Sequence, residues 1–114
     1  MQRQEASILL SALSGQRALV IGDVMLDAFV YGEVTRISRE APVPVLSESR
    51  RTLMLGGAGN LVRNIASLGG KPFVISLVGK DQAGATIGQL LDECAPGAAA
   101  LIEEDGRLTP TKTR

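Results

Sequence analysis

Residues 55–64 read LGGAGNLVRN and join a glycine-rich turn directly to a segment with helical apolar spacing. The turn is therefore predicted to lie at the N-terminus of a helix, where the first backbone N–H groups have no partner within the helix. Such N–H groups attract any electron-rich oxygen, so the position alone leaves open a phosphate, a sugar or no ligand. The sequence around the turn has to decide among these three.

Helix and strand patterns alternate on both sides of this turn. Apolar runs typical of strands buried on both faces of a parallel sheet are residues 18–21, 72–78 and 98–102. Helical spacing marks residues 8–13, 58–68 and 82–94. Short connections between such elements predict an α/β fold in which helices flank a parallel sheet through right-handed crossovers.

Residues 24–55 depart from this alternation and show an irregular pattern. Pro42 and Pro44 flank Val43, and proline lacks the N–H that a central strand donates to its neighbour. We therefore expect this segment to form an edge strand or an exposed flap that stands away from the core sheet.

The composition excludes several classes of protein. The chain has 114 residues, 45% of them hydrophobic and 21% charged, which predicts one small soluble domain. Twelve basic residues balance twelve acidic ones without clustering, so neither nucleic acid nor a membrane is an expected partner. With Cys94 as the single cysteine and no histidine, disulfides, zinc sites and Ser-His or Cys-His catalysis are excluded. These features predict a cytoplasmic protein.

Two nucleotide-binding motifs are also missing. No glycine precedes a Lys-Ser or Lys-Thr pair in the frame of a Walker A loop. The dinucleotide fingerprint G-x-G-x-x-G finds Gly57 and Gly59 here, but Val62 occupies the position of its third glycine. The glycine turn therefore does not have the pattern of a nucleotide site.

Two aspartates follow the first predicted strand in the sequence GDVMLD, residues 22–27. In α/β proteins ligands collect at the carboxyl ends of parallel strands. A carboxylate there is able to accept hydrogen bonds from two hydroxyls of a polyol, whereas an aspartate directly after a strand commonly caps a turn. We interpret Asp27 as the functional residue and Asp23 as the structural one.

Polar residues of the helix after the glycine turn, and Arg36 in the segment before it, are further candidates for the site. Asn60 offers an acceptor and two donors to sugar hydroxyls, and its alternative role is an N-cap or first-turn residue. Arg36 and Arg63 are candidates to neutralise a substrate phosphate or are solvated side chains. Asn64 lies one turn after Asn60 and is a candidate contact of the flap.

Four segments, in this order, carry a family resemblance: VIGDVMLDAFVYGEVTRISREAPVPVL (residues 20–46), LGGAGNLVRNIASLGG (55–70), VGKDQAG (78–84) and PTKTR (110–114). Together they resemble the N-terminal third of the ribokinase-like carbohydrate kinases, of the phosphofructokinase-B type. Within that family they most resemble the heptose 7-phosphate kinases of lipopolysaccharide core biosynthesis, which share YGEVTRIS and EAPVPV.

The resemblance implies an α/β/α sandwich with a small β lid at about residues 24–55. It implies transfer of the ATP γ-phosphate, with Mg²⁺, to the anomeric hydroxyl of D-glycero-β-D-manno-heptose 7-phosphate. Family members hold the sugar through positions that correspond here to Asp27, Gly56, Gly57 and Asn60. They also commonly pair through their lids, which makes residues 30–46 the expected surface of a homodimer.

The family's catalytic G-A-G-D motif has no counterpart in the chain. Residues 57–60 read GAGN, and the amide of Asn60 does not take up a proton near neutral pH. We therefore expect residues 1–114 to be an N-terminal fragment of the kinase domain, without a catalytic residue, a metal ligand, or ATP and Mg²⁺ of its own. The alternatives are a non-catalytic module that binds a sugar phosphate or pairs with a kinase through its lid, and a chain that folds poorly alone because flanking strands are missing.

Overall fold

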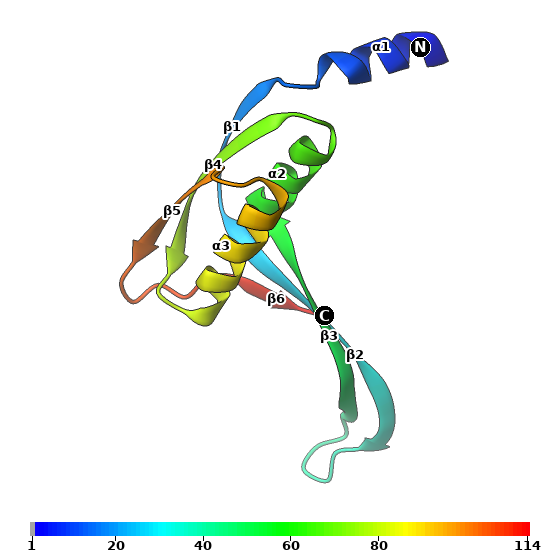
Figure 1. Ribbon diagram of the computed structural model, residues 1–114. Coiled ribbons are helices and arrows are strands. Elements are labelled where there is room, and N and C mark those ends of the chain that lie inside the picture. The colour runs from blue at the N-terminus through cyan, green and yellow to red at the C-terminus, as the bar shows by residue number, and fades with distance from the viewer. Residues whose placement is uncertain (1) are drawn as a thin grey trace.

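The computed structural model describes residues 2–114, which form three helices and six strands (Figure 1). In chain order these elements are α1 (Arg3–Ala12), β1 (Arg17–Ile21), β2 (Val24–Ile37), β3 (Pro44–Gly57), α2 (Ala58–Ser67), β4 (Lys71–Gly79), α3 (Gln82–Cys94), β5 (Ala99–Glu104) and β6 (Thr111–Thr113). The predicted helices and strands are therefore present, and the α/β fold class is confirmed.

The strands form two sheets that meet at the end of β1. The first sheet has the order β1-β4-β5 and is entirely parallel, whereas the second has the order β3-β2-β6, with β3 antiparallel and β6 parallel to β2. Only Gly22 and Asp23 separate β1 from β2. The buried hydroxyl of Ser76 on β4 accepts a hydrogen bond from the Val24 N–H at 3.0 Å, which ties the two sheets together.

The hydrophobic core lies between these sheets and the helices α2 and α3. Its fully buried members come from both sheets and both helices: Val24, Val74, Val62, Ile87 and Leu91. Ile87 and Leu91 are four residues apart and so share one face of α3. Burial of a side chain of this size contributes about 1.5–3 kcal/mol, so these few contacts hold the body of the molecule together.

The outer face of the first sheet differs from the sequence prediction. Residues 18–21 were expected to be buried on both faces, yet Leu19 and Ile21 of β1 are 62% and 74% exposed. Leu19 pairs with Phe73 of β4, which is 41% exposed on the same face. The reason is that α2 and α3 both pack on the opposite face, where Val20 and Val74 are buried.

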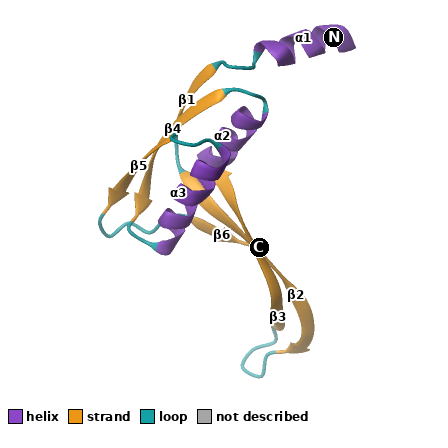
Figure 2. Ribbon diagram, in the orientation of Figure 1, coloured by secondary structure: helices purple, strands orange, loops and turns teal. Residues whose placement is uncertain are grey.

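Residues 24–57 form a long hairpin, where the sequence predicted an edge strand or an exposed flap and the family resemblance implied a β lid. Strands β2 and β3 pair from Val24–Gly57 to Ile37–Pro44, with register shifts after Tyr31 and Val34. The hairpin leaves the body of the molecule (Figure 2), so both faces of its far half are exposed and no apolar alternation is required there. Pro44 stands at the last pair of an edge strand, as the missing N–H predicts. We call β2, β3 and the connecting residues 38–43 the lid hairpin.

Helix α1 confirms the prediction of a short opening helix but contributes no buried side chain to the described structure. Its apolar residues Ile8 and Leu9 are 65% and 59% exposed. After α1, Gly15 has a φ of 75° and donates its N–H to the Gly69 carbonyl at 2.7 Å, which fixes the entry into β1.

Asp81 connects the start of α3 to the chain segment before β6. Its carboxylate accepts hydrogen bonds from the Gly84 N–H at 2.8 Å, the Thr109 N–H at 2.8 Å and the Thr109 hydroxyl at 2.7 Å. The Thr109 hydroxyl in turn accepts from the Gly79 N–H at 2.9 Å. The bonds from Thr109, followed by that from Gly84, lower the pKa of Asp81.

We predict that Asp81→Asn lowers the free energy of unfolding at pH 7 and makes stability less dependent on acid pH. Since the folded pKa lies below the ordinary value of 3.8, the stabilisation is complete above that value and is lost as the pH falls through it toward the folded pKa. Urea denaturation at several pH values measures the effect. Asp105→Asn is the control, because that side chain is 87% exposed; an equal loss in both variants would contradict the prediction.

Candidate functional site

The glycine turn lies against the connection between the two sheets. The Asp23 carbonyl accepts a hydrogen bond from the Ala58 N–H at 2.9 Å, at the first residue of α2. Gly57 has φ 55° and ψ −132°, and a Cβ added to it would lie 2.4 Å from the Asp23 carbonyl oxygen. Only glycine fits this position. The Asp23 carboxylate is 75% exposed and lies 3.9 Å from Arg107, so the backbone of Asp23 makes the structural contact.

Asp27 lies beside the other glycine of the turn. A Cβ added to Gly56 would lie 3.0 Å from both Cγ and Oδ2 of Asp27, so the carboxylate faces bare backbone. The side chain of Asp27 is 20% exposed. Its Oδ1 atom is buried and, among the described residues, accepts no hydrogen bond. A half-buried carboxylate with unused acceptor capacity therefore lies next to the N-terminus of α2.

Asn60 occupies the first turn of α2, whose N-cap is Gly57. Its side-chain oxygen accepts a hydrogen bond from the Arg63 guanidinium at 3.1 Å. Arg63 also lines a small hollow with Leu90 and Cys94 of α3. The guanidinium of Arg63 thus orients Asn60 and lies toward α3.

The structure separates the two remaining predicted residues from this cluster. Arg36 pairs with Val45 near the tip of the lid hairpin, and its separation of nine positions from Asp27 corresponds to about 30 Å along the strand. Asn64 is exposed, and within residues 2–114 its side chain makes no hydrogen bond to the lid hairpin. Asp27, Gly56 and Gly57 are brought together, whereas Arg36 is not.

Sequence reasoning missed Arg114 and Phe29. Arg114 Nη1 lies 3.2 Å from Asp27 Oδ1, and its guanidinium carbon lies 5.3 Å from the centre of the Phe29 ring. The available signal was the alternation in residues 111–114, TKTR, which places Lys112 and Arg114 on one face of a strand. The alternation does not predict which strand pairs with the one that carries Lys112 and Arg114.

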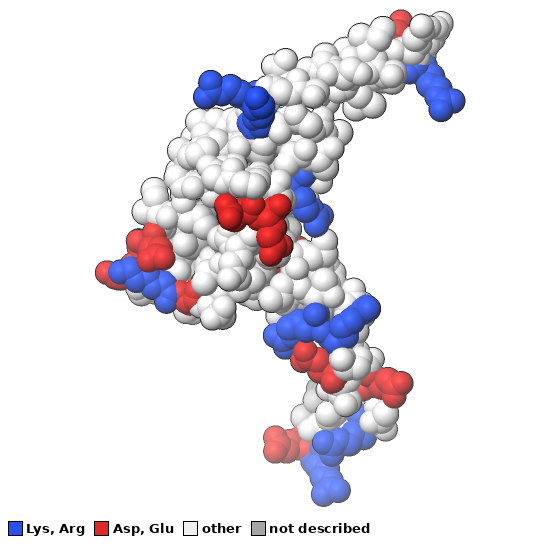
Figure 3. All heavy atoms as spheres, in the orientation of Figure 1, with Lys and Arg blue, Asp and Glu red and all other residues white. Residues whose placement is uncertain are grey.

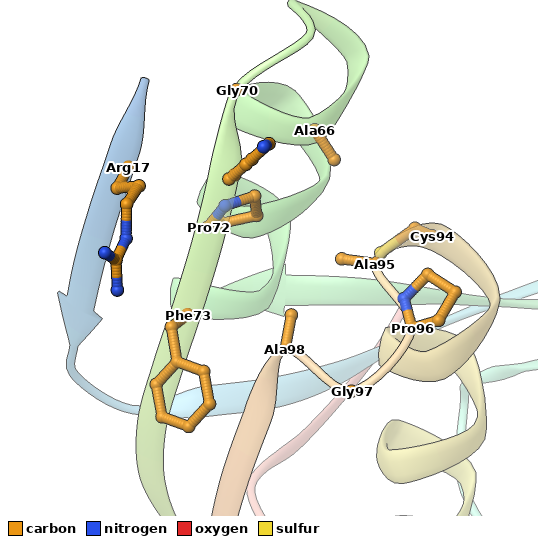
Figure 4. Close-up of a pocket in the computed structure, with 11 residues that line it drawn as sticks. Arg17, Ala66, Gly70, Pro72, Phe73, Cys94, Ala95, Pro96, Gly97 and Ala98 are labelled. Atoms are coloured by element: carbon orange, nitrogen blue, oxygen red, sulfur yellow. The ribbon is translucent and has the colours of Figure 1, made fainter. Parts of the chain in front are cut away.

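A second hollow, of about 470 Å³, lies at the amino ends of β1 and β4. Figure 4 shows Arg17 and Phe73 on one side of it and the turn from Cys94 to Ala98 on the other. Burial raises the pKa of the Cys94 thiol, which disfavours the nucleophilic thiolate. Since ligands of such sheets bind at the carboxyl ends of the strands, the cluster around Asp27 is the better candidate site.

Comparison with known proteins identifies the family. Residues 16–113 match the pfkB family of carbohydrate kinases. The chain belongs to this family. It is 52% identical over 103 residues to a bifunctional protein HldE of Caulobacter vibrioides, and 45% identical over 114 residues to one of Citrifermentans bemidjiense. These alignments cover 90% and 100% of the chain but 21% and 23% of the two relatives, so the chain spans less than a quarter of their length.

Solved structures of carbohydrate kinases share the fold of this pfkB family chain. A carbohydrate kinase from Agrobacterium tumefaciens superimposes with a TM-score of 0.68 at 23% identity, covering 86% of the chain and 30% of that structure. Phosphofructokinase-2 from Escherichia coli, in complex with substrates and products, gives 0.63 at 25% identity over 87% of the chain and 30% of that structure. The α/β body and lid hairpin thus have the ribokinase-like arrangement.

No helix among residues 2–114 combines the length and apolar character needed to cross a bilayer. The same residues contain no group of three or more His, Cys, Asp or Glu side chains placed to hold a metal ion.

We predict that Gly57→Ala destabilises the chain more than Gly97→Ala. Both glycines have positive φ, but a Cβ at Gly97 meets nothing within 4 Å, whereas one at Gly57 meets the Asp23 carbonyl. Backbone strain alone costs about 1 kcal/mol or more at either position, and the clash adds to it at Gly57. Urea denaturation measures the free energy of unfolding of both variants, and an equal decrease in the two would contradict the geometry assigned to the turn.

Proposed function

We propose that residues 1–114 form the acceptor-binding part of a kinase that transfers the ATP γ-phosphate to the anomeric hydroxyl of D-glycero-β-D-manno-heptose 7-phosphate. The single observation that supports sugar binding best is the Asp27 carboxylate, which faces the bare backbone of Gly56 and whose buried Oδ1 is ion-paired with Arg114 at 3.2 Å but accepts no hydrogen bond. The carboxylate therefore keeps acceptor capacity for the hydroxyls of a ligand.

The arrangement around Asp27 suits a polyol. The carboxylate accepts hydrogen bonds from two neighbouring hydroxyls, and N–H groups of the first turn of α2 donate to ligand oxygens. Asn60, oriented by Arg63, adds a side-chain amide on the same turn. The absence of a side chain at Gly56 lets the Asp27 carboxylate and Met25 pack against the backbone of the turn.

The identity of the sugar rests on sequence similarity. The segments YGEVTRIS and EAPVPV resemble the heptose 7-phosphate kinases, and two proteins named HldE are 52% and 45% identical to the chain. A role in lipopolysaccharide core biosynthesis and a cytoplasmic location belong to the same proposal; the location accords with the single cysteine, Cys94.

Phosphate transfer itself is not assigned to these residues. ATP with Mg²⁺ supplies the phosphoryl group in this family, but residues 2–114 show no metal-binding cluster and no Walker A motif, in which a glycine directly precedes Lys-Ser or Lys-Thr. The G-A-G-D sequence is absent as well, with Asn60 at the aspartate position of the GAGN segment. We propose that residues 1–114 bind the acceptor and, by themselves, do not phosphorylate it.

We predict that Asp27→Asn raises the Kd for heptose 7-phosphate by about 10- to 100-fold, the equivalent of one or two hydrogen bonds to a charged acceptor. Isothermal titration calorimetry on the purified chain measures the change. Asp23→Asn is the matched control, since its carboxylate is 75% exposed and its structural contact is made by the backbone. Equal losses in the two variants, or none in Asp27→Asn, would remove Asp27 from the site.

A second proposal concerns the lid hairpin, which we infer to pair with a second copy of the chain. Its far half exposes the apolar side chains Tyr31, Val34, Ile37, Val43 and Leu46, each more than 40% exposed. Both signs of charge accompany them along the hairpin (Figure 3), including the Glu48–Arg51 ion pair at 3.0 Å. An apolar strip with mixed charge suits a self-complementary interface.

We predict that Ile37→Glu shifts sedimentation of the chain from dimer to monomer, because a charge at the interface costs several kcal/mol of association. Ile21→Glu is the control, because Ile21 is also exposed, at 74%, but lies on the outer face of the first sheet. A shift seen only with Ile21→Glu would place the contact on that sheet and overturn pairing through the lid hairpin.

A further inference from the structure

The face of the second sheet that carries Asp27 has an unusual charge distribution. Residues paired across neighbouring strands project from the same face of a sheet. Register therefore places Lys112 beside Asp27, and Arg50 beside Tyr31. Arg114 continues β6 by donating its N–H to the Ala28 carbonyl at 2.9 Å and accepting from the Val30 N–H at 2.7 Å. Among the side chains of residues 25–31 and their paired neighbours, Asp27 is the only carboxylate on this face.

Two contacts position the Arg114 side chain, and some of its hydrogen-bond donors remain free. Its guanidinium carbon lies 5.3 Å from the centre of the Phe29 ring, which favours a cation over the ring face. Its Nη1 atom lies 3.2 Å from Asp27 Oδ1, yet the two atoms are not aligned for a hydrogen bond. The side chain is 44% exposed. Arg114 therefore neutralises Asp27 and retains donors that face solvent.

Burial of the opposite face of β2 fixes the direction in which Asp27 and Phe29 project. Leu26 and Ala28 of β2 are 5% and 2% exposed and pack into the body of the molecule. Strand alternation then requires Asp27 and Phe29 to project from the outer face. The carboxylate, the aromatic ring and the cation thus form one fixed surface rather than a set of independent side chains.

We propose that Arg114, assisted by Lys112, binds the phosphate of the acceptor while Asp27 holds its hydroxyls, so that the site selects a phosphorylated sugar over a neutral one. This inference rests on the function proposed above and adds the residue that determines this selectivity. Planar guanidinium donors match phosphate oxygens in pairs. Three cations and one carboxylate leave this face positive, which favours an anionic sugar over its neutral counterpart.

The alternative assignment of the phosphate to Arg36 or Arg63 is less well supported by the contacts. Arg63 donates to Asn60 at 3.1 Å and lines a hollow against α3. Arg36 lies near the tip of the lid hairpin, beside Val45. Neither contacts the Asp27 carboxylate, whereas Arg114 does.

The test compares heptose 7-phosphate with the unphosphorylated heptose by titration calorimetry on the purified chain. For Arg114→Gln we expect the Kd of the phosphorylated sugar to rise about tenfold or more, and that of the neutral sugar to change less than about threefold. Arg114→Lys keeps the charge but loses the paired donors, so its Kd for the phosphorylated sugar should lie between those of the unmodified chain and Arg114→Gln. Arg17→Gln, at the amino end of β1, should behave like the unmodified chain. Thermal unfolding confirms that each variant is folded.

The outcomes separate this inference from the proposed function. If the unmodified chain binds both sugars and Arg114→Gln weakens both equally or neither, the selectivity of Arg114 is overturned and sugar binding remains. If the unmodified chain binds neither sugar, both proposals are overturned. Increasing salt should weaken binding of the phosphorylated sugar in the unmodified chain and much less in Arg114→Gln.

Discussion

The contact between the Asp23 carbonyl and the start of α2 is the constraint from which the rest of the site follows. The 2.9 Å hydrogen bond from the Ala58 N–H requires the chain to turn at Gly57 with positive φ, where a Cβ would collide with the same carbonyl. This turn places the N-terminus of α2 at the carboxyl end of β1. It also leaves Gly56 beside Asp27 on the neighbouring strand.

The contact between Asp23 and α2 lies at the junction of the two sheets. One sheet is parallel and packs on α2 and α3, whereas the other is a hairpin joined by β6. Only Gly22 and Asp23 connect them, and Ser76 bonds across the junction. The near half of the lid hairpin is therefore fixed by the core, while its far half extends into solvent. A ligand bound at Asp27 lies at the boundary between a rigid body and an exposed arm.

Much of the fold could be predicted from local pattern, because apolar period and glycine position are local properties. The strand at Ala18 and the helix after Gly57 are examples. The exposure of Leu19 and Ile21 could not be predicted, since it depends on which side of the sheet α2 and α3 occupy. An edge strand or flap was expected in residues 24–55, and the family resemblance implied a β lid there, but the bounds of its two long strands could not be predicted, because the exposed far half of the hairpin has no alternation to detect.

The site shows the same division. Asp27 is a candidate because it follows a predicted strand, and the family resemblance implies Gly56 and Gly57. The position of Arg114 depends on the pairing of β2 with β6, residues more than eighty positions apart. Nothing in the local sequence around Arg114 names Asp27 as its neighbour. The proximity of Arg114 to Asp27 therefore follows from long-range register, which local sequence patterns do not reveal.

The most direct test of sugar binding at the glycine turn is a nuclear magnetic resonance titration of the ¹⁵N-labelled chain with heptose 7-phosphate. We predict that backbone resonances of Gly56, Gly57 and Asp27 shift in a saturable manner, while those of the hollow around Pro96 and Gly97 remain unchanged. Shifts confined to that hollow, or no saturable shift at Gly56 and Gly57, would contradict the account.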